Sequence, residues 1–174
     1  NVVLTDALEC CWHCRNAKLR GVQAEHGDYL FMHGENIDVD GFRLNGNYSF
    51  QYCRNVVIRN AEIHSKDAFW NTEDVTVYDS VVDGEYLGWH SRNLRLVNCR
   101  ISGTQALCYA ENLVLENCTL GEDADLCFEY SSVHAEIKGR VHSVKNPRSG
   151  RIVAEEYGDI ILDEHCKAPA NCSI

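Results

Sequence analysis

The sequence has 174 residues, 45% of them hydrophobic and 24% charged, which suits one folded domain and excludes a largely disordered chain. A formal net charge of −10, from 16 Lys and Arg against 26 Asp and Glu, argues against nucleic acid as a partner, because phosphate backbones bind basic surfaces. No apolar run approaches the roughly 18 residues of a membrane helix, so no membrane partner is expected. The first residue is Asn rather than Met, and we expect early residues of the natural protein to be missing.

Ten cysteines begin with a close group at Cys10, Cys11 and Cys14. The paired spacing of zinc ligands is absent there, and we predict no metal and no cofactor. Most cysteines occupy repeat positions where other turns carry Ala, Ser, Thr or Gly, which predicts reduced thiols in a core. The sequence therefore favours a cytoplasmic protein, with Cys99 and Cys118 as the pair best placed to form a bridge.

A polar residue recurs along most of the chain at nearly constant spacing. The members of this anchor column are Asn16, Asn36, Asn55, Asp74, Asn93, Asn112 and Ser132. Successive members lie 20, 19, 19, 19, 19 and 20 residues apart. A period this strict over six intervals is typical of a solenoid.

Each repeat predicts three strands in chain order. Apolar residues stand one and three places after the anchor, as in Val56 and Ile58, which is the alternation of a strand. A second polar column follows, consisting of Asn60, Asp79, Asn98 and Asn117, and a short strand comes after it. A third, longer strand is expected before each anchor, as in residues 86–92. The fold class predicted is all-β, a right-handed parallel β-helix of about 19 residues per turn; the left-handed alternative needs a six-residue unit that the sequence lacks.

The polar columns and a charged column suit the corners of such a helix. Asn accepts left-handed backbone angles, and its amide can bond to the next Asn in the stack. Immediately before the anchor, Arg and Glu alternate from turn to turn. This charged column consists of Arg15, Glu35, Arg54, Glu73, Arg92 and Glu111. The alternation predicts a ladder of ion pairs that opposes a slip by one turn.

The strict repeat ends near residue 137. We divide the chain into regular turns over residues 1–137 and irregular final turns with a C-terminal tail over residues 138–174. The second segment is expected to cover the end of the solenoid, where unpaired strand edges would otherwise be exposed.

Strict alternation along the third strand gives it an unusual outer face. It places Phe31, Phe50 and Phe69 outward, and it places Trp12, Met32, Trp70, Trp89 and Phe128 in the core. One interpretation is that a bulge turns the Phe column inward, or that a loop or a second subunit covers it. The other is an open groove whose aromatic rings stack on sugars.

The best candidate site lies on this face, on three consecutive turns. The candidate binding residues are Tyr48, Tyr52, Asn71 and Tyr86, and the weak catalytic candidates are Asp67 and His90. Asp67 is the only carboxylate among them, so a two-carboxylate hydrolase is not supported. Lys66 is expected to point to the opposite side.

Several segments resemble an uncharacterised bacterial family of pectin-lyase-like right-handed β-helix proteins. They include Ser-Lys-Asp-Ala-Phe-Trp-Asn at 65–71, Val-Thr-Val-Tyr-Asp-Ser at 75–80 and Gly-Glu-Tyr-Leu-Gly-Trp at 84–89. The resemblance covers nearly the whole chain and implies that it corresponds to the C-terminal part of longer members. It implies a fold and assigns no catalytic residue.

Two functions remain open at this stage, and enzymatic activity is left undecided. The first is a carbohydrate-interacting protein with an oligo- or polysaccharide partner and a weak or lost lyase- or hydrolase-like activity. The alternative is a non-catalytic scaffold or protein-interaction module, with a homo-oligomer formed through the Phe/Tyr face.

Overall fold

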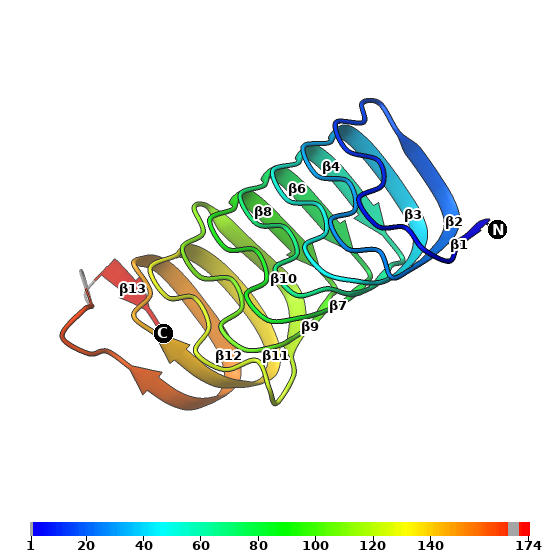
Figure 1. The fold of residues 1–174 in the computed structure, drawn as a ribbon. Helices are drawn as coiled ribbons and strands as arrows, with labels where there is room; N and C mark the ends of the chain where they lie inside the picture. Colours follow the sequence, from blue (N-terminus) through cyan, green and yellow to red (C-terminus); the bar gives the residue numbers. More distant parts are fainter. Residues whose placement is uncertain (1, 167–170) are drawn as a thin grey trace.

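The computed structural model describes residues 2–166 and 171–174, and it is a parallel β-solenoid of about nine turns with about 19 residues per turn (Figure 1). The predicted fold class is thereby confirmed. The strands are β1 (Val2–Leu4), β2 (Lys18–Glu25), β3 (Glu35–Asn45), β4 (Arg54–Arg59), β5 (Glu62–His64), β6 (Glu73–Tyr78), β7 (Val81–Asp83), β8 (Arg92–Val97), β9 (Arg100–Ser102), β10 (Leu113–Leu120), β11 (Ser132–Lys145), β12 (Ser149–Ile161) and β13 (Cys172–Ser173).

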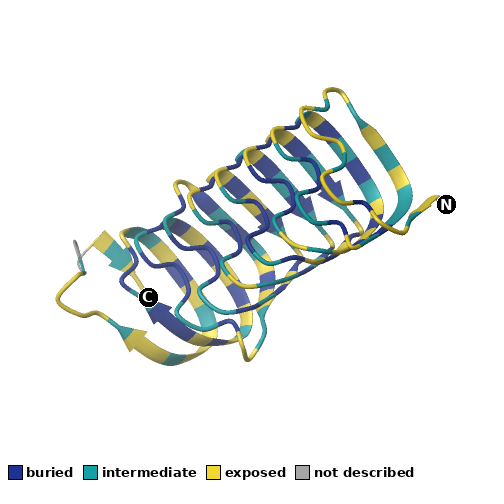
Figure 2. Cartoon of the chain, in the orientation of Figure 1, coloured by how far each residue is buried: buried dark blue, intermediate teal, exposed yellow. Residues whose placement is uncertain are grey.

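The strands pair only in parallel, each with its equivalent in the turns before and after. Because the register keeps equivalent residues together, Val56 lies opposite Val75, and Val75 lies opposite Leu94. These side chains are fully buried, and the interior they fill runs the length of the molecule (Figure 2). Alternation along each strand therefore builds one continuous hydrophobic core.

Both polar columns form the predicted hydrogen-bonded stacks. Every Asn and Asp of the two columns has a φ between 49° and 56°, a left-handed conformation that Asn and Asp adopt more readily than most residues. The amide of Asn55 donates to Asn36 Oδ1 at 2.6 Å, and that of Asn93 donates to Asp74 Oδ1 at 2.8 Å. Asn98 donates to Asp79 at 2.9 Å in the second column. The corners are thus linked from turn to turn by side chains as well as by backbone.

The charged column also pairs as predicted. Arg92 lies between two glutamates, with nitrogen–oxygen distances of 3.5 Å to Glu73 and 3.4 Å to Glu111. Arg54 approaches Glu73 at 3.4 Å, and Arg15 approaches Glu35 at 3.6 Å. These side chains are substantially exposed, so each pair is weak, and their main effect is to disfavour a shifted register.

The third side of each turn differs from the prediction, because it contains no regular β-strand. We call it the corrugated side; its segments are residues 29–34, 48–53, 67–72, 86–91 and 105–110. Every second residue there has a positive φ, for example 62° at Tyr48, 57° at Phe50 and 56° at Tyr52. The amides of these residues bond alternately to the following and the preceding turn: Tyr48 donates to Lys66 O and Phe50 donates to Leu30 O.

This backbone changes which side chains enter the core. Phe31, Phe50 and Phe69 are buried and stack at ring-centroid distances of 5.0 and 5.5 Å. Of the two interpretations of the Phe column, the inward one is therefore confirmed. The predicted inward position of Trp12, Met32, Trp70 and Trp89 is wrong: Trp12 is 41% exposed and the other three are half-buried, whereas Phe128 is buried as expected. Strand alternation fails here because the side chains do not follow a period of two.

At the C-terminal end, β11 and β12 pair over most of their length, with one irregularity between Ile137 and Arg140. Short β13 pairs with the start of β12. Residues 167–170 of the predicted tail lie outside the described residues. No helix within the described part of the chain is long and apolar enough to cross a membrane.

Candidate functional site

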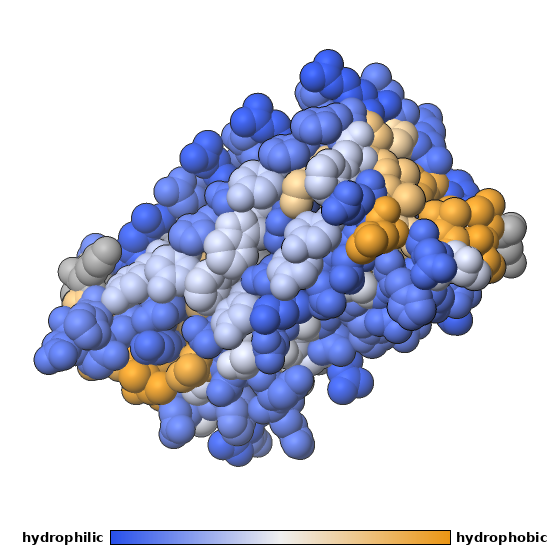
Figure 3. Space-filling model, viewed as in Figure 1, coloured by the Kyte–Doolittle hydropathy of each residue, from blue (hydrophilic) through white to orange (hydrophobic). Residues whose placement is uncertain are grey.

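A groove of about 650 Å³ lies on the corrugated side and crosses several turns. It is lined by Tyr29, Tyr48, Gln51, Tyr52, Lys66, Asp67, Trp70, Tyr86, Trp89 and Gln105. The face toward the viewer in Figure 3 carries a band of intermediate hydropathy between hydrophilic margins, running along the solenoid. Turns about 4.8 Å apart give five successive lining positions, from Tyr29 to Gln105, a span of about 19 Å.

The solenoid repeat arranges the aromatic residues in rows. Tyr29 and Tyr48 stack at 4.6 Å between centroids and 13° between ring planes. Trp70 and Trp89 lie 5.4 Å apart, and Trp89 is held by its indole N–H, which donates to Gln105 O at 2.7 Å. The equivalent N–H of Trp70 has no hydrogen-bond partner in the described part of the chain, so it remains available to a ligand.

Asp67 occupies the row of Tyr48 and Tyr86 and differs from them in chemistry. The residue is only 8% exposed, yet among the described residues its carboxylate has no hydrogen bond and no ion pair. Burial raises the pKa of the Asp67 carboxyl above its ordinary value; the positive charge of Lys66 opposes this rise and the negative charge of Glu85 adds to it. A buried acceptor without a partner is costly in a folded protein, and a ligand that donates to it removes that cost.

Lys66 lines the groove instead of pointing to the opposite side, which corrects the prediction for this residue. The reason is the absence of strand alternation on the corrugated side. Its Nζ lies 3.6 Å from Glu85 Oε2 and 5.3 Å from the centroid of the Tyr86 ring. The lysine is therefore held at the margin of the groove by an ion pair and a cation–π contact.

The structure divides the six predicted site residues between two neighbouring hollows. Tyr48, Tyr52, Asp67 and Tyr86 line the groove. Asn71 and His90 line a smaller hollow that Tyr52 also borders. In that hollow His90 stacks on Tyr109 at 5.0 Å. Asp67 and His90 are thus not brought together in one cavity.

Sequence reasoning missed four lining residues of the groove. They are Gln51, Lys66, Trp70 and Trp89. Both tryptophans were assigned to the core because large apolar residues in alternation with exposed ones usually enter it. The available signal was chemical: the same segments already offered Phe50 and Phe69 for the interior.

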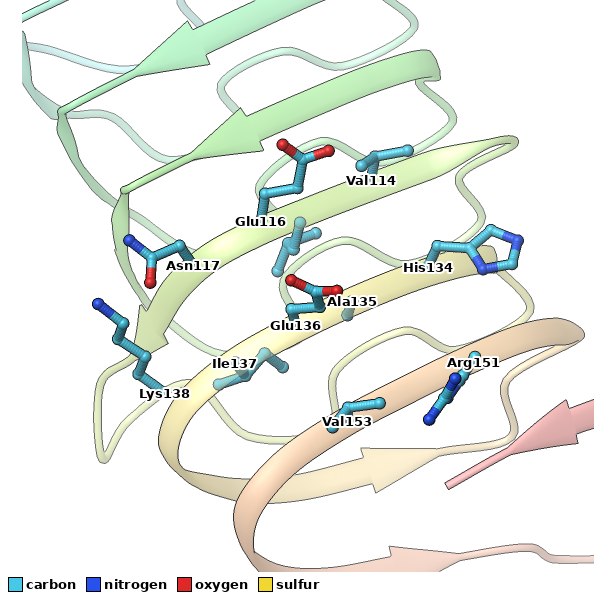
Figure 4. Close-up of a pocket in the computed structure, with 11 residues that line it drawn as sticks. Val114, Glu116, Asn117, His134, Ala135, Glu136, Ile137, Lys138, Arg151 and Val153 are labelled. Atoms are coloured by element: carbon cyan, nitrogen blue, oxygen red, sulfur yellow. The ribbon is translucent and has the colours of Figure 1, made fainter.

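A second hollow, of about 550 Å³, lies on the strand side near the C-terminal end. Figure 4 shows its side chains standing on the neighbouring strands β10, β11 and β12. His134, Glu136, Lys138 and Arg151 in this hollow are all exposed. Solvent already satisfies such groups, and the hollow has no feature comparable to Asp67. The groove is therefore the stronger candidate site.

Metal binding has no support in the described part of the chain, since no group of three or more His, Cys, Asp or Glu side chains there is placed to hold an ion. Asp67 is also the only carboxylate that lines the groove. Glycoside hydrolysis ordinarily needs two carboxyl groups on either side of the bond. The arrangement is thus suited to binding rather than to hydrolysis.

A comparison with protein families gives a match over residues 1–174, to the family described as "Protein of unknown function (DUF3737)". The chain belongs to this family. The predicted membership of an uncharacterised family is thereby confirmed, and the structure adds that this member is a parallel β-solenoid. No curated protein and no solved structure matches the chain. Its function therefore has to be argued from the groove itself.

Proposed function

We propose that the protein binds an extended oligo- or polysaccharide along the groove of the corrugated side. The observation that carries this proposal is Asp67, a nearly buried carboxylate without a protein partner in a groove with aromatic walls. Aromatic rings offer flat apolar surfaces to the faces of sugar rings, while Asp67 accepts hydrogen bonds from hydroxyl groups. The unpartnered N–H of Trp70 supplies a donor beside this acceptor.

The dimensions of the groove also favour an extended ligand. Equivalent residues repeat along the solenoid axis, so a chain molecule with its own repeat can make the same contact several times. The groove is open rather than enclosed, as the position of Tyr52, 43% exposed at its margin, illustrates. The Phe column is unavailable for the predicted homo-oligomer through the Phe/Tyr face, because its rings lie in the core.

We place the protein in a reducing compartment, in keeping with a cytoplasmic location. All ten cysteines are free thiols, and five of them, Cys53, Cys99, Cys108, Cys118 and Cys127, are buried in the interior. The thiol of Cys53 donates to Phe31 O at 2.7 Å, as a small polar core residue would. Oxidation of such residues would disturb a packed interior.

A glycan-binding screen on the full chain, followed by titration of tryptophan fluorescence, tests the proposed function. Trp70→Ala should weaken the affinity for a bound oligosaccharide at least tenfold, because it removes both a stacking surface and a donor. The matched control is Tyr78→Ala, since Tyr78 is a half-buried aromatic residue on the strand side, 5.7 Å from the guanidinium of Arg59. Equal affinities of the two folded variants, or binding of no glycan at all, would contradict the proposal.

A further inference from the structure

The charges around the groove are unbalanced. Lys66 and Asp67 are the charged residues that line it, and Lys66 is already paired with Glu85 at 3.6 Å. Asp67 has no counter-ion in the described part of the chain. The local sum of Lys66, Asp67 and Glu85 is negative, and the whole chain carries a formal charge of −10. The field in the groove therefore attracts cations and repels anions.

The aromatic residues strengthen this preference. Tyr48, Trp70, Tyr86 and Trp89 share the groove with Asp67. Their ring faces carry the negative part of the aromatic quadrupole, which attracts ammonium groups. Tyr86 already shows this interaction with Lys66 Nζ at 5.3 Å. Aromatic faces around an unpaired carboxylate are an environment in which an organic cation is stabilised by both kinds of group.

We propose that the groove selects glycans with free, protonated amino groups over neutral and acidic glycans. This inference rests on the proposed function and specifies its ligand class. An ammonium group on the sugar would donate charge-assisted hydrogen bonds to Asp67 while the sugar ring stacks on Trp70 or Trp89. An N-acetylated sugar lacks the charge. A uronic acid would place a second negative charge beside Asp67 and Glu85.

The test compares a β-1,4-linked glucosamine oligomer with its fully N-acetylated counterpart and with an oligogalacturonate of equal length. Binding to the full chain is measured by tryptophan fluorescence at pH 6, in low and in high salt. We expect the glucosamine oligomer to bind at least tenfold more tightly than the N-acetylated oligomer. The advantage should shrink at high salt, because screening weakens the attraction between exposed charges.

Asp67→Asn should remove most of this advantage, and it should change the affinity for the N-acetylated oligomer by less than twofold. The matched control is Glu136→Gln, which removes one negative charge from the exposed face of β11, away from the groove. If both variants reduce the advantage equally, the overall charge causes the preference, and the assignment to Asp67 is overturned.

Other outcomes separate this inference from the proposed function. Equal binding of the aminated and acetylated oligomers would overturn the selection for amino groups and leave saccharide binding intact. Failure of every oligosaccharide to bind would overturn both. Tetramethylammonium tests the contribution of the sugar: if it displaces the glucosamine oligomer at the oligomer's own concentration, a cation alone suffices, and the glycan class is overturned.

Discussion

Replacement of Phe50 by Ala tests the most unexpected feature of the fold, the inward direction of the Phe column. Phe50 is fully buried, stacks on Phe31 and Phe69, and meets the ring of Phe42 edge-on at 6.3 Å. Loss of the buried side chain costs about 2 kcal/mol in transfer free energy, and a cavity of the order of 80 Å³ costs about as much again. We therefore expect the free energy of unfolding to fall by about 4 kcal/mol.

Tyr52 supplies a matched comparison two residues further along the same segment. It has the same left-handed backbone, with a φ of 56° against 57° for Phe50, and it also stacks on a neighbouring ring, that of His33 at 4.9 Å. Because Tyr52 is 43% exposed, Tyr52→Ala should cost about 1 kcal/mol or less. Backbone strain is unchanged in both variants, since Ala and the aromatic residues tolerate a positive φ about equally poorly.

Urea denaturation followed by circular dichroism and by tryptophan fluorescence measures both costs. Coincidence of the two transitions is required before free energies are compared, because a solenoid can unfold in sections. Phe50→Leu serves as a conservative variant, since Leu107 fills the equivalent position three turns later and is fully buried. If Phe50→Ala costs no more than Tyr52→Ala, both side chains face solvent and the argument for the corrugated side fails.

Three further predictions concern the corners and the pH dependence of stability. Asn93→Ala should cost more than Asn93→Gly, by about 1 kcal/mol in urea denaturation, because both lose the hydrogen bonds to the stack but only Gly adopts a φ of 55° without strain. Gly103→Ala should destabilise by about 3 kcal/mol or more, since its Cβ would lie 2.3 Å from a backbone oxygen, whereas Gly139→Ala, with a similar positive φ and open space, should cost about 1 kcal/mol; equal shifts in melting temperature would refute the steric argument. Hydrogen bonds from His64 to Asp83 and then Glu62 raise the pKa of His64, so its contribution is fully present below about pH 6.5, the unfolded value, and is lost as the pH rises through the folded value. The exposed site limits this contribution to about 0.5 kcal/mol, so His64→Gln should lower stability more at pH 5.5 than at pH 8.5, and a pH-independent difference would contradict it.

The parts of the fold that sequence predicted well obey simple periodic rules. Two apolar positions after each anchor define the strand, and Asn at a fixed interval defines the corner, because few other residues suit both the backbone and the stack. The corrugated side obeys no such rule. Aromatic residues such as Tyr48 and Phe50 rarely adopt a positive φ, so nothing in their identity announces one. Contacts between turns impose that conformation.

The candidate site was predicted in part for the same reason. Equivalent positions on neighbouring turns lie together whatever the local backbone, so Tyr48, Asp67 and Tyr86 were correctly placed in one row. Directions within a turn depend on the backbone, and these were wrong for Trp70 and Lys66. Stacking between turns was therefore readable from the period alone, whereas the cross-section of a turn was not.

The alternating amides of the corrugated side have a consequence for how the chain can change in length. One inserted residue would reverse the direction of every following amide in that segment, so insertions must fall elsewhere. The two 20-residue intervals show where. Glu25 pairs 20 residues ahead with Asn45, but Tyr29 is equivalent to Tyr48, 19 residues ahead, so the extra residue lies between 25 and 29. In the later interval it lies between 120 and 125, because β9 and β10 pair 19 apart while the Gln105 amide meets Asp125 O, 20 apart. Both extra residues occupy the same corner, which is where insertions that add a loop at the end of the groove would be accommodated.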